Sequence, residues 1–212
     1  MGEEPQRSLS YGEYLSLNDL LSLQREGSVS SDEMHFIVVH QTFELWFKQV
    51  IRELAESRDA LDTESVAEEA IPVVVHRLGR VTEIFRLMAQ QWSVMETLSP
   101  QDFLAFRDAL GSASGFESAQ MRELEILIGL QDNQRNGGMD PLKRFVQMAE
   151  TSEQGKVDLD RLRARMDEIS LWDTARNWLG RTPIDGSTPD SENDTEVVQS
   201  YVEAHIAALE QH

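Results

Sequence analysis

The sequence predicts an all-α protein, and three observations support this. Apolar residues recur at alternating steps of three and four along most of the chain, which is the spacing of one face of an α-helix. Helix start and stop signals separate these stretches, and no segment reads as a strand. With 212 residues and no internal repeat, we expect a single helical domain over residues 1–212.

The first long helix is expected from Ser30, because Ser30 and Glu33 have the spacing of a capping box. One apolar face then runs through six positions, namely Phe36, His40, Phe43, Phe47, Val50 and Leu54. A second apolar strip includes Val39 and Trp46. A helix that is apolar on two sides is usually central in its bundle, so we expect this helix to lie at the centre.

The second long helix is expected to begin near Ser65, with Glu68 as its capping partner. Pro72 is expected to kink or restart it, because proline lacks the backbone donor of a helix interior. The same apolar rhythm continues through Val74, Leu78, Val81, Phe85, Met88, Trp92 and Met95. The Ser99-Pro100 pair predicts its end.

The remaining elements are expected to be shorter. Helices are predicted over residues 100–110, 116–130, 141–150, 158–169 and 171–179. Glycines predict a turn over residues 111–115 and a break at Asn136-Gly137-Gly138. A polar loop rich in Pro, Gly and Ser covers residues 181–194, and a last amphipathic helix starts near Asp194.

The composition limits the partners of the chain. The formal net charge is −19, from 19 Lys and Arg against 38 Asp and Glu, so nucleic acid and anionic membranes are repelled. No stretch is long and apolar enough to cross a bilayer, and the first residues do not resemble a signal peptide. The absence of Cys excludes disulfides and thiolate metal sites. This composition fits a cytoplasmic protein.

His40 lies in the middle of the apolar face of the first long helix. A lone histidine in such a position is more often a hydrogen-bonded core residue than a ligand or a base. Its neighbours Phe36, Phe43 and Phe47 nevertheless predict an aromatic wall with one polar group, a composition typical of apolar ligand pockets. Both interpretations of His40 follow from the pattern.

Arg107 lies in the segment FRDALGSASGF, just before a glycine-flanked turn. A guanidinium beside a pocket binds a carboxylate through two parallel hydrogen bonds. The alternative is a surface arginine paired with Asp102 or Asp108. Ser112 and Ser114 either add hydroxyl donors to the pocket or cap the following helix.

Three segments resemble the N-terminal signature blocks of the tryptophan 2,3-dioxygenase family, in the family's order and with similar spacing. They are YGEYLSLNDLLSLQ from Tyr11, DEMHFIVVHQTFELWFK from Asp32 and FLAFRDALGSASGFESAQMRELEILIG from Phe103. The resemblance covers roughly residues 10–135, and LWDTARNWL from Leu171 is a weaker match to a later block. Three blocks in order are a far more specific signal than one alone.

The resemblance implies a helical bundle of the tryptophan 2,3-dioxygenase type, assembled as a homo-oligomer that is a dimer or a tetramer. It implies haem b as the cofactor and L-tryptophan and molecular oxygen as substrates. The reaction would insert both oxygen atoms across the indole C2–C3 bond and give N-formylkynurenine.

The resemblance also implies roles for individual residues. His40 would hydrogen-bond the indole N–H, Phe36 would pack on the indole, Arg107 would bind the substrate carboxylate and Ser114 would lie in the pocket wall. The N-terminal segment 1–28 would enter a neighbouring subunit's site through Tyr11, Tyr14 and Leu15.

The sequence departs from the family's pattern in the pocket and near its end. Phe103 and Met121 stand where the family usually has tyrosine, which raises the alternative of an indole monooxygenase-like relative. The motif that carries the proximal haem ligand does not occur. Among the other histidines, His35 lies on the Val39–Trp46 side of the first long helix, and His76 lies off the apolar stripe of the second and is expected on the surface. His205 is a weak candidate for the iron ligand.

Three explanations of this departure stay open: a truncated enzyme, a short homologue with different haem ligation or none, and a protein completed by a separate chain. We expect the 212-residue chain to bind haem weakly unless another group supplies the ligand. The competing functional classes are a haem-free helical protein that binds an indole amino acid and a plain helical interaction domain.

Overall fold

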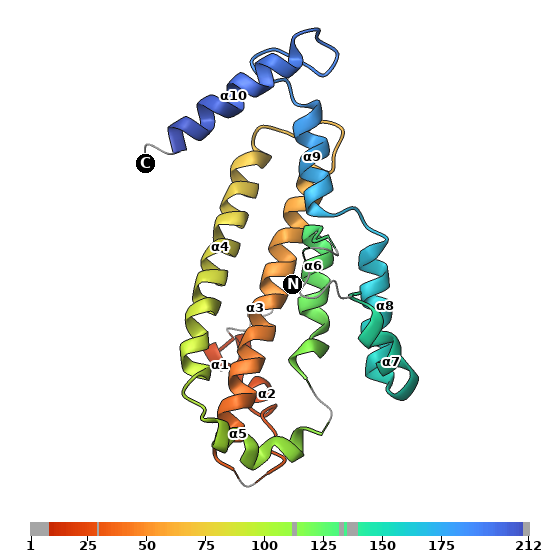
Figure 1. Ribbon diagram of the computed structural model, residues 1–212. Helices are drawn as coiled ribbons and strands as arrows, with labels where there is room; N and C mark the ends of the chain where they lie inside the picture. The colour runs from red at the N-terminus through yellow and green to blue at the C-terminus, as the bar shows by residue number, and fades with distance from the viewer. Residues whose placement is uncertain (1–8, 29, 112–113, 132–133, 135–139, 210–212) are drawn as a thin grey trace, which may run out of the picture. The chain divides into compact units, whose positions relative to one another are not determined.

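The computed structural model describes residues 9–28, 30–111, 114–131, 134 and 140–209, apart from the side chains at positions 205 and 209. Within this part the only β feature is one isolated bridge between Ile184 and Ser187. The all-α prediction is therefore confirmed. The elements, shown in Figure 1, are α1 (Tyr11–Tyr14), α2 (Leu17–Leu20), α3 (Asp32–Leu61), α4 (Ala70–Met95), α5 (Pro100–Phe106), the 3₁₀ helices η1 (Arg107–Leu110) and η2 (Gly115–Glu117), α6 (Ala119–Ile128), α7 (Lys143–Thr151), α8 (Glu153–Met166), α9 (Leu171–Arg181) and α10 (Asp194–Leu209).

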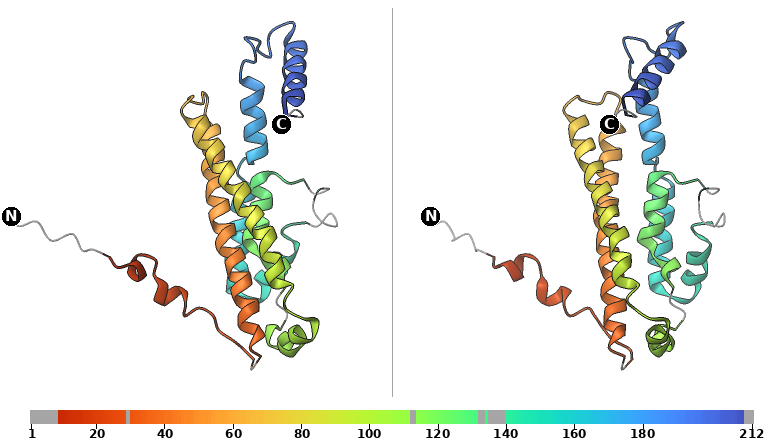
Figure 2. Two further views of the ribbon diagram at one scale, coloured as in Figure 1. Left: turned by 90° about the vertical axis from the view of Figure 1, so that its left-hand side faces the viewer. Right: turned by 60° about the vertical axis from the view of Figure 1, so that its left-hand side comes forward.

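The chain divides into two compact units. The first unit comprises Met1–Trp46 and Phe85–Phe116, and the second comprises Phe47–Ile84 and Glu117–His212. The helices α3 and α4 lie side by side in Figures 1 and 2, and each contributes one part to each unit. One domain over residues 1–212 stays a prediction.

The start of α3 corrects the predicted cap. The helix begins at Asp32 instead of Ser30, and the carboxylate of Glu33 bonds to Gly27 and Ser28. The predicted capping box between Ser30 and Glu33 is therefore wrong. The carboxylate has closer partners in the preceding segment, which the local four-residue pattern does not include.

The apolar strips of the two long helices are confirmed in outline. The buried positions on α3 and α4 include Val39, Val50, Leu54, Val74, Val81, Ile84 and Met88. Phe85 and Trp92, both predicted on the apolar side of α4, are exposed. The helix starts at Ala70, five residues after Ser65, and Pro72 falls in its first turn, where a missing N–H breaks no intrahelical bond.

In the second unit, α3 and α4 are joined through the buried carboxylate of Glu53, which is 2% exposed. It accepts hydrogen bonds from Gln49 Nε2 at 2.7 Å, from Arg77 Nη1 at 2.9 Å and from Arg80 Nη1. Burial raises the pKa of Glu53, but the bonds from Arg80 and Arg77 outweigh it, so the net pKa is lowered. The buried carboxylate is thus held in its charged form.

The helices α6, α7 and α8 share an apolar cluster in the second unit. Its buried members are Ala119, Phe145, Leu159 and Leu162. The backbones of α7 and α8 approach closely at Gly155, where a Cβ atom would lie 2.5 Å from the Met148 carbonyl carbon. Only glycine fits there. The helix α8 starts at Glu153, before the predicted Asp158, and the Ser152 side chain caps it by accepting from the Gly155 N–H.

The C-terminal elements follow the prediction more closely. The helix α9 covers Leu171–Arg181 and α10 begins at Asp194, after the polar loop. On α10 the side chains of Tyr201 and Ile206 are exposed. The predicted break at 136–138 lies outside the described residues. In the described part of the chain, no helix combines the length and the apolar character that crossing a membrane requires.

We predict that Glu53→Ala lowers the free energy of unfolding by about 3 kcal/mol, because it leaves two arginines beside a cavity without their carboxylate. Urea unfolding followed by circular dichroism measures this. Because the pKa of Glu53 is lowered from 4.5, its contribution is present above pH 4.5 and is lost as the pH falls through its lower folded value. The control is Glu153→Ala, at an exposed position, which should leave the free energy of unfolding nearly unchanged. Equal effects of the two substitutions would contradict the prediction.

Candidate functional site

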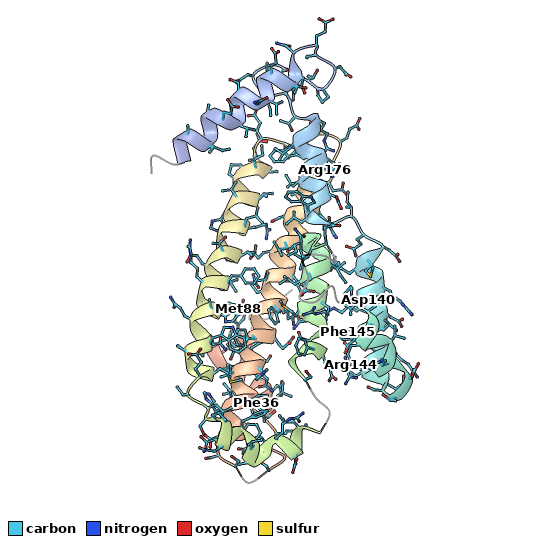
Figure 3. The ribbon with its side chains drawn as sticks, viewed as in Figure 1. Phe36, Met88, Asp140, Arg144, Phe145 and Arg176 are labelled. Atoms are coloured by element: carbon cyan, nitrogen blue, oxygen red, sulfur yellow. The ribbon has the colours of Figure 1, made fainter. Side chains whose placement is uncertain are left out.

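Three phenylalanines from α3 and α5 form an aromatic wall in the first unit. The ring centroid of Phe36 lies 5.9 Å from that of Phe103 and 5.5 Å from that of Phe106. Phe103 and Phe106 meet edge to face, with centroids 5.5 Å apart and planes at 83°. Figure 3 labels Phe36 on α3, near α5. Such tilted and edge-to-face pairs are the favoured arrangements of aromatic rings.

Local sequence explains why α5 presents these rings to α3. Ser99 caps α5 by accepting a hydrogen bond from the Asp102 backbone N–H at 3.2 Å, and Pro100 occupies its first turn. Phe103 and Phe106 are three residues apart, so they share one side of the helix. Phe106 is 1% exposed and anchors the wall, whereas Phe103 is half-buried.

His40 adds one polar group to this wall. Its ring lies 4.0 Å from the ring of Phe36, and its Nδ1 atom lies 2.8 Å from the Phe36 carbonyl oxygen. A carbonyl oxygen only accepts, so Nδ1 carries the proton, and in the neutral imidazole Nε2 is left as an acceptor. In the described part of the chain, Nε2 has no hydrogen-bond partner. The hydrogen-bonded histidine therefore still offers one acceptor.

Arg107 follows the wall directly as the first residue of η1. Its Nη1 donates to the Gly111 carbonyl oxygen at 2.9 Å, which uses one of five guanidinium N–H groups. Gly111 has a φ of 58°, a left-handed conformation that glycine adopts without strain. Among the described residues, neither Asp102 nor Asp108 forms an ion pair with Arg107. The turn thus orients a guanidinium that keeps further donors for a carboxylate.

Ser114 is exposed, and its hydroxyl accepts a hydrogen bond from the Phe116 N–H at 3.3 Å. This bond lies at the short turn η2, whereas the following helix α6 is capped by Ser118. The place of Ser114 in a pocket wall stays a prediction, and Ser112 lies outside the described residues. Met121 is half-buried in the first turn of α6, in the second unit, where its N–H bonds to Ser118.

The N-terminal arm, by which we mean residues 9–22, carries three exposed apolar side chains. Tyr11 and Tyr14 are 76% and 75% exposed, and Leu15, which follows α1, is 41% exposed. A capping box between Ser10 and Glu13 starts α1. The Ser-x-x-Glu pattern of this cap is present in the sequence but is not among the predicted caps. The buried anchor Phe106 was likewise not predicted, and its only sequence signal is its three-residue spacing from Phe103.

The other histidines have different surroundings. His35 Nε2 lies 3.1 Å from the Val94 carbonyl oxygen, and the exposed His76 Nε2 lies 3.1 Å from Arg80 Nη2. The side chain of His205, on α10, and His212 lie outside the described part. Over the described residues, no group of three or more His, Cys, Asp or Glu side chains is arranged to hold a metal ion.

An aromatic wall with one imidazole acceptor, directly followed by an arginine on a glycine-supported turn, thus characterises this all-helical protein. The chain belongs to the tryptophan 2,3-dioxygenase family. The sequence profile of this family, described as Tryptophan 2,3-dioxygenase, matches residues 2–211. The expectation from the three sequence blocks is confirmed.

Several curated relatives support this membership. The chain is 37% identical to tryptophan 2,3-dioxygenase 2 of Ralstonia nicotianae, over 96% of the chain and 55% of the relative. It is 38% identical to tryptophan 2,3-dioxygenase of Dictyostelium discoideum, over 86% of the chain and 45% of the relative. It is 40% identical to tryptophan 2,3-dioxygenase of Aedes aegypti, over 82% of the chain and 44% of the relative. The chain spans about half the length of the curated relatives it matches.

A haem cofactor is only partly matched by the described residues. The aromatic wall and the open Nε2 of His40 suit the side of a haem pocket that faces the substrate. A haem would also need an axial donor for its iron, and one ring nitrogen of His35 and one of His76 contact the Val94 carbonyl oxygen and Arg80. The described residues therefore include groups suited to the substrate side of a haem, and they do not single out an axial ligand for the iron.

We predict that Phe106→Ala destabilises the protein by about 3–5 kcal/mol, because it opens a cavity under the wall. Phe116→Ala is the matched control, since Phe116 is 63% exposed, and it costs much less. Chemical denaturation monitored by near-ultraviolet circular dichroism compares the two variants. If Phe116→Ala were as damaging as Phe106→Ala, the wall would not rest on Phe106.

Proposed function

We propose that this chain supplies the tryptophan-binding side of a haem-dependent dioxygenase that converts L-tryptophan and molecular oxygen into N-formylkynurenine. The observation that carries the proposal is the wall of Phe36, Phe103 and Phe106 with His40, directly followed by Arg107. Family membership and the names of the relatives support it.

Recognition of the indole begins with its N–H group, which only donates a hydrogen bond. His40 is suited to accept it, because the Phe36 carbonyl keeps the proton on Nδ1 and leaves Nε2 as the acceptor. The ring of Phe36 offers an apolar face for the indole to pack against. Phe36 thus acts twice, through its ring and through its carbonyl.

Recognition of the amino-acid end is assigned to Arg107. The bond from Nη1 to the Gly111 carbonyl orients the guanidinium and leaves its other donors for the substrate carboxylate. A bidentate contact to a carboxylate fixes both the position and the direction of the amino acid. Ser114 is proposed to complete the pocket near this end.

The haem, when bound, supplies the activation of oxygen, and this chain's residues orient the indole and exclude water. The proximal ligand of the iron is proposed to come from outside the described residues, and His205 is a weak candidate for it. The reaction adds both oxygen atoms to the indole C2–C3 bond, so no further reactant is required.

The assembly is proposed to be a homo-oligomer, a dimer or a tetramer, in the cytoplasm. The exposed Tyr11, Tyr14 and Leu15 on the arm support an exchange in which the arm completes a neighbouring subunit's site. One alternative is an indole monooxygenase-like relative, suggested by Phe103, which has no hydroxyl. That reaction would also need a two-electron reductant to convert the second oxygen atom into water. A haem-free protein that binds an indole amino acid is the other alternative.

Arg107→Ala is expected to weaken L-tryptophan binding by about 2–4 kcal/mol, because a charge-assisted contact to the carboxylate is lost. Tryptamine, which has no carboxylate, should bind the native protein and the variant equally. Isothermal titration with both ligands measures the difference, and Arg163→Ala on α8 is the control. Unchanged affinity for tryptophan with an intact fold would remove Arg107 from the site.

His40→Ala is expected to retain any haem that the native protein binds, and to lose only part of the activity. The variant should also lose the preference for tryptophan over 1-methyltryptophan, which has no indole N–H. Soret absorption and steady-state kinetics measure these effects. A complete loss of haem from a folded variant would identify His40 as an axial ligand. Indole binding by a native protein without a Soret band would favour the haem-free alternative.

A further inference from the structure

The segment between the arm and α3, residues 23–28, is bonded to α3 at two points, and we call it the strap. The first point is Gln41, the residue after His40. Gln24 Nε2 donates to Gln41 Oε1 at 2.6 Å, and Gln41 Nε2 donates to the Leu23 carbonyl oxygen at 3.4 Å. One end of the strap is therefore attached beside the candidate indole acceptor.

The second point is Glu33, whose side chain is almost completely buried. Its carboxylate accepts from the Gly27 N–H at 2.8 Å, from the Ser28 N–H at 2.7 Å and from the Ser28 hydroxyl at 2.6 Å. The bonds from Ser28 and from Gly27 lower the pKa of Glu33, so the carboxylate is charged at neutral pH. Charge-assisted bonds of this kind are stronger than neutral ones.

Helix geometry places this second point on the same face as the site. Glu33 precedes Phe36 by three residues and His40 by seven, which is close to two turns of a helix with 3.6 residues per turn. The two points of attachment, Glu33 and Gln41, thus lie on either side of Phe36 and His40 along α3.

The strap also passes close to the turn that carries Arg107. A Cβ atom on Gly27 would lie 3.5 Å from the Cβ atom of Ala109, in ordinary van der Waals contact. Ala109 belongs to η1, of which Arg107 is the first residue. Gly27 is therefore bonded to Glu33 on one side and lies about one methyl group away from η1 on the other.

We propose that Glu33 is a positioning residue for tryptophan binding, which clamps the strap along the face of Phe36 and His40 and against the Arg107 turn. This inference rests on the proposed function. Release of the clamp would free the arm and remove the support of η1. Binding of the substrate's carboxylate would be weakened more than binding of its indole, because η1 carries the guanidinium of Arg107.

The first test measures the clamp without any ligand. Arg25 is exposed within the strap, so trypsin cleavage after Arg25, followed by mass spectrometry, reports how often the strap detaches. Glu33→Gln keeps the shape but loses the charge and replaces one acceptor by a donor, and we expect roughly tenfold faster cleavage, the equivalent of ~1.4 kcal/mol. Asp173→Asn, the same change at the capped start of α9, is the matched control and leaves this rate unchanged.

The second test measures the consequence for binding. Glu33→Gln should weaken the affinity for L-tryptophan by about tenfold. The affinity for tryptamine, which has no carboxylate, should change by less than about threefold. Ser28→Ala removes one donor and should give a smaller effect in the same direction. Combined with Glu33→Gln it should add little, since both substitutions break the same bond.

The outcomes separate the clamp from the proposed function. Unchanged cleavage after Arg25 in both Glu33→Gln and Ser28→Ala would overturn the clamp. Faster cleavage with unchanged tryptophan affinity would show that Glu33 only fastens the strap, and would overturn its role in positioning. A native protein that binds no tryptophan would overturn the proposed function and that role with it, whereas the cleavage rates would still judge the clamp. If Glu33→Gln does not fold, Ser28→Ala decides both measurements.

Discussion

The periodicity of α3 is the constraint on which the candidate site depends. Residues three, four and seven apart lie on one face of a helix, so Glu33, Phe36 and His40 are neighbours by geometry. The bond between His40 Nδ1 and the Phe36 carbonyl spans one such turn. A helix break in this stretch would separate the strap, the aromatic wall and the imidazole at once.

Buried carboxylates link separate segments in this acidic chain. Glu53 joins α3 to two arginines of α4, and Glu123 on α6 pairs with Arg161 and Arg165 of α8. The largely buried side chains of Arg77 and Arg165 thus pair with carboxylates that would otherwise be costly to bury. These contacts are directional, and they specify which helices pair more than apolar burial alone would.

The site combines polar groups that are already partly satisfied. His40 uses one ring nitrogen within α3 and Arg107 uses one guanidinium group on Gly111, so both are oriented before a ligand arrives. Such preorganisation reduces the ordering cost of binding. The same principle applies to the strap, which Glu33 and Gln41 hold against α3. The site is thus built from local bonds within the first unit.

Much of the fold was determined by the sequence alone. Apolar spacing located α3, α4, α9 and α10, and three family blocks selected Phe36, His40 and Arg107, because helix periodicity and motif order are properties of the linear chain. Tertiary structure decided the partners. The Ser-x-x-Glu pattern assigned Glu33 to Ser30, but the preceding loop folds back and offers Gly27 and Ser28. Likewise, only packing buried Phe106 and brought the backbones of α7 and α8 together at Gly155, because long-range contacts depend on how the chain returns on itself.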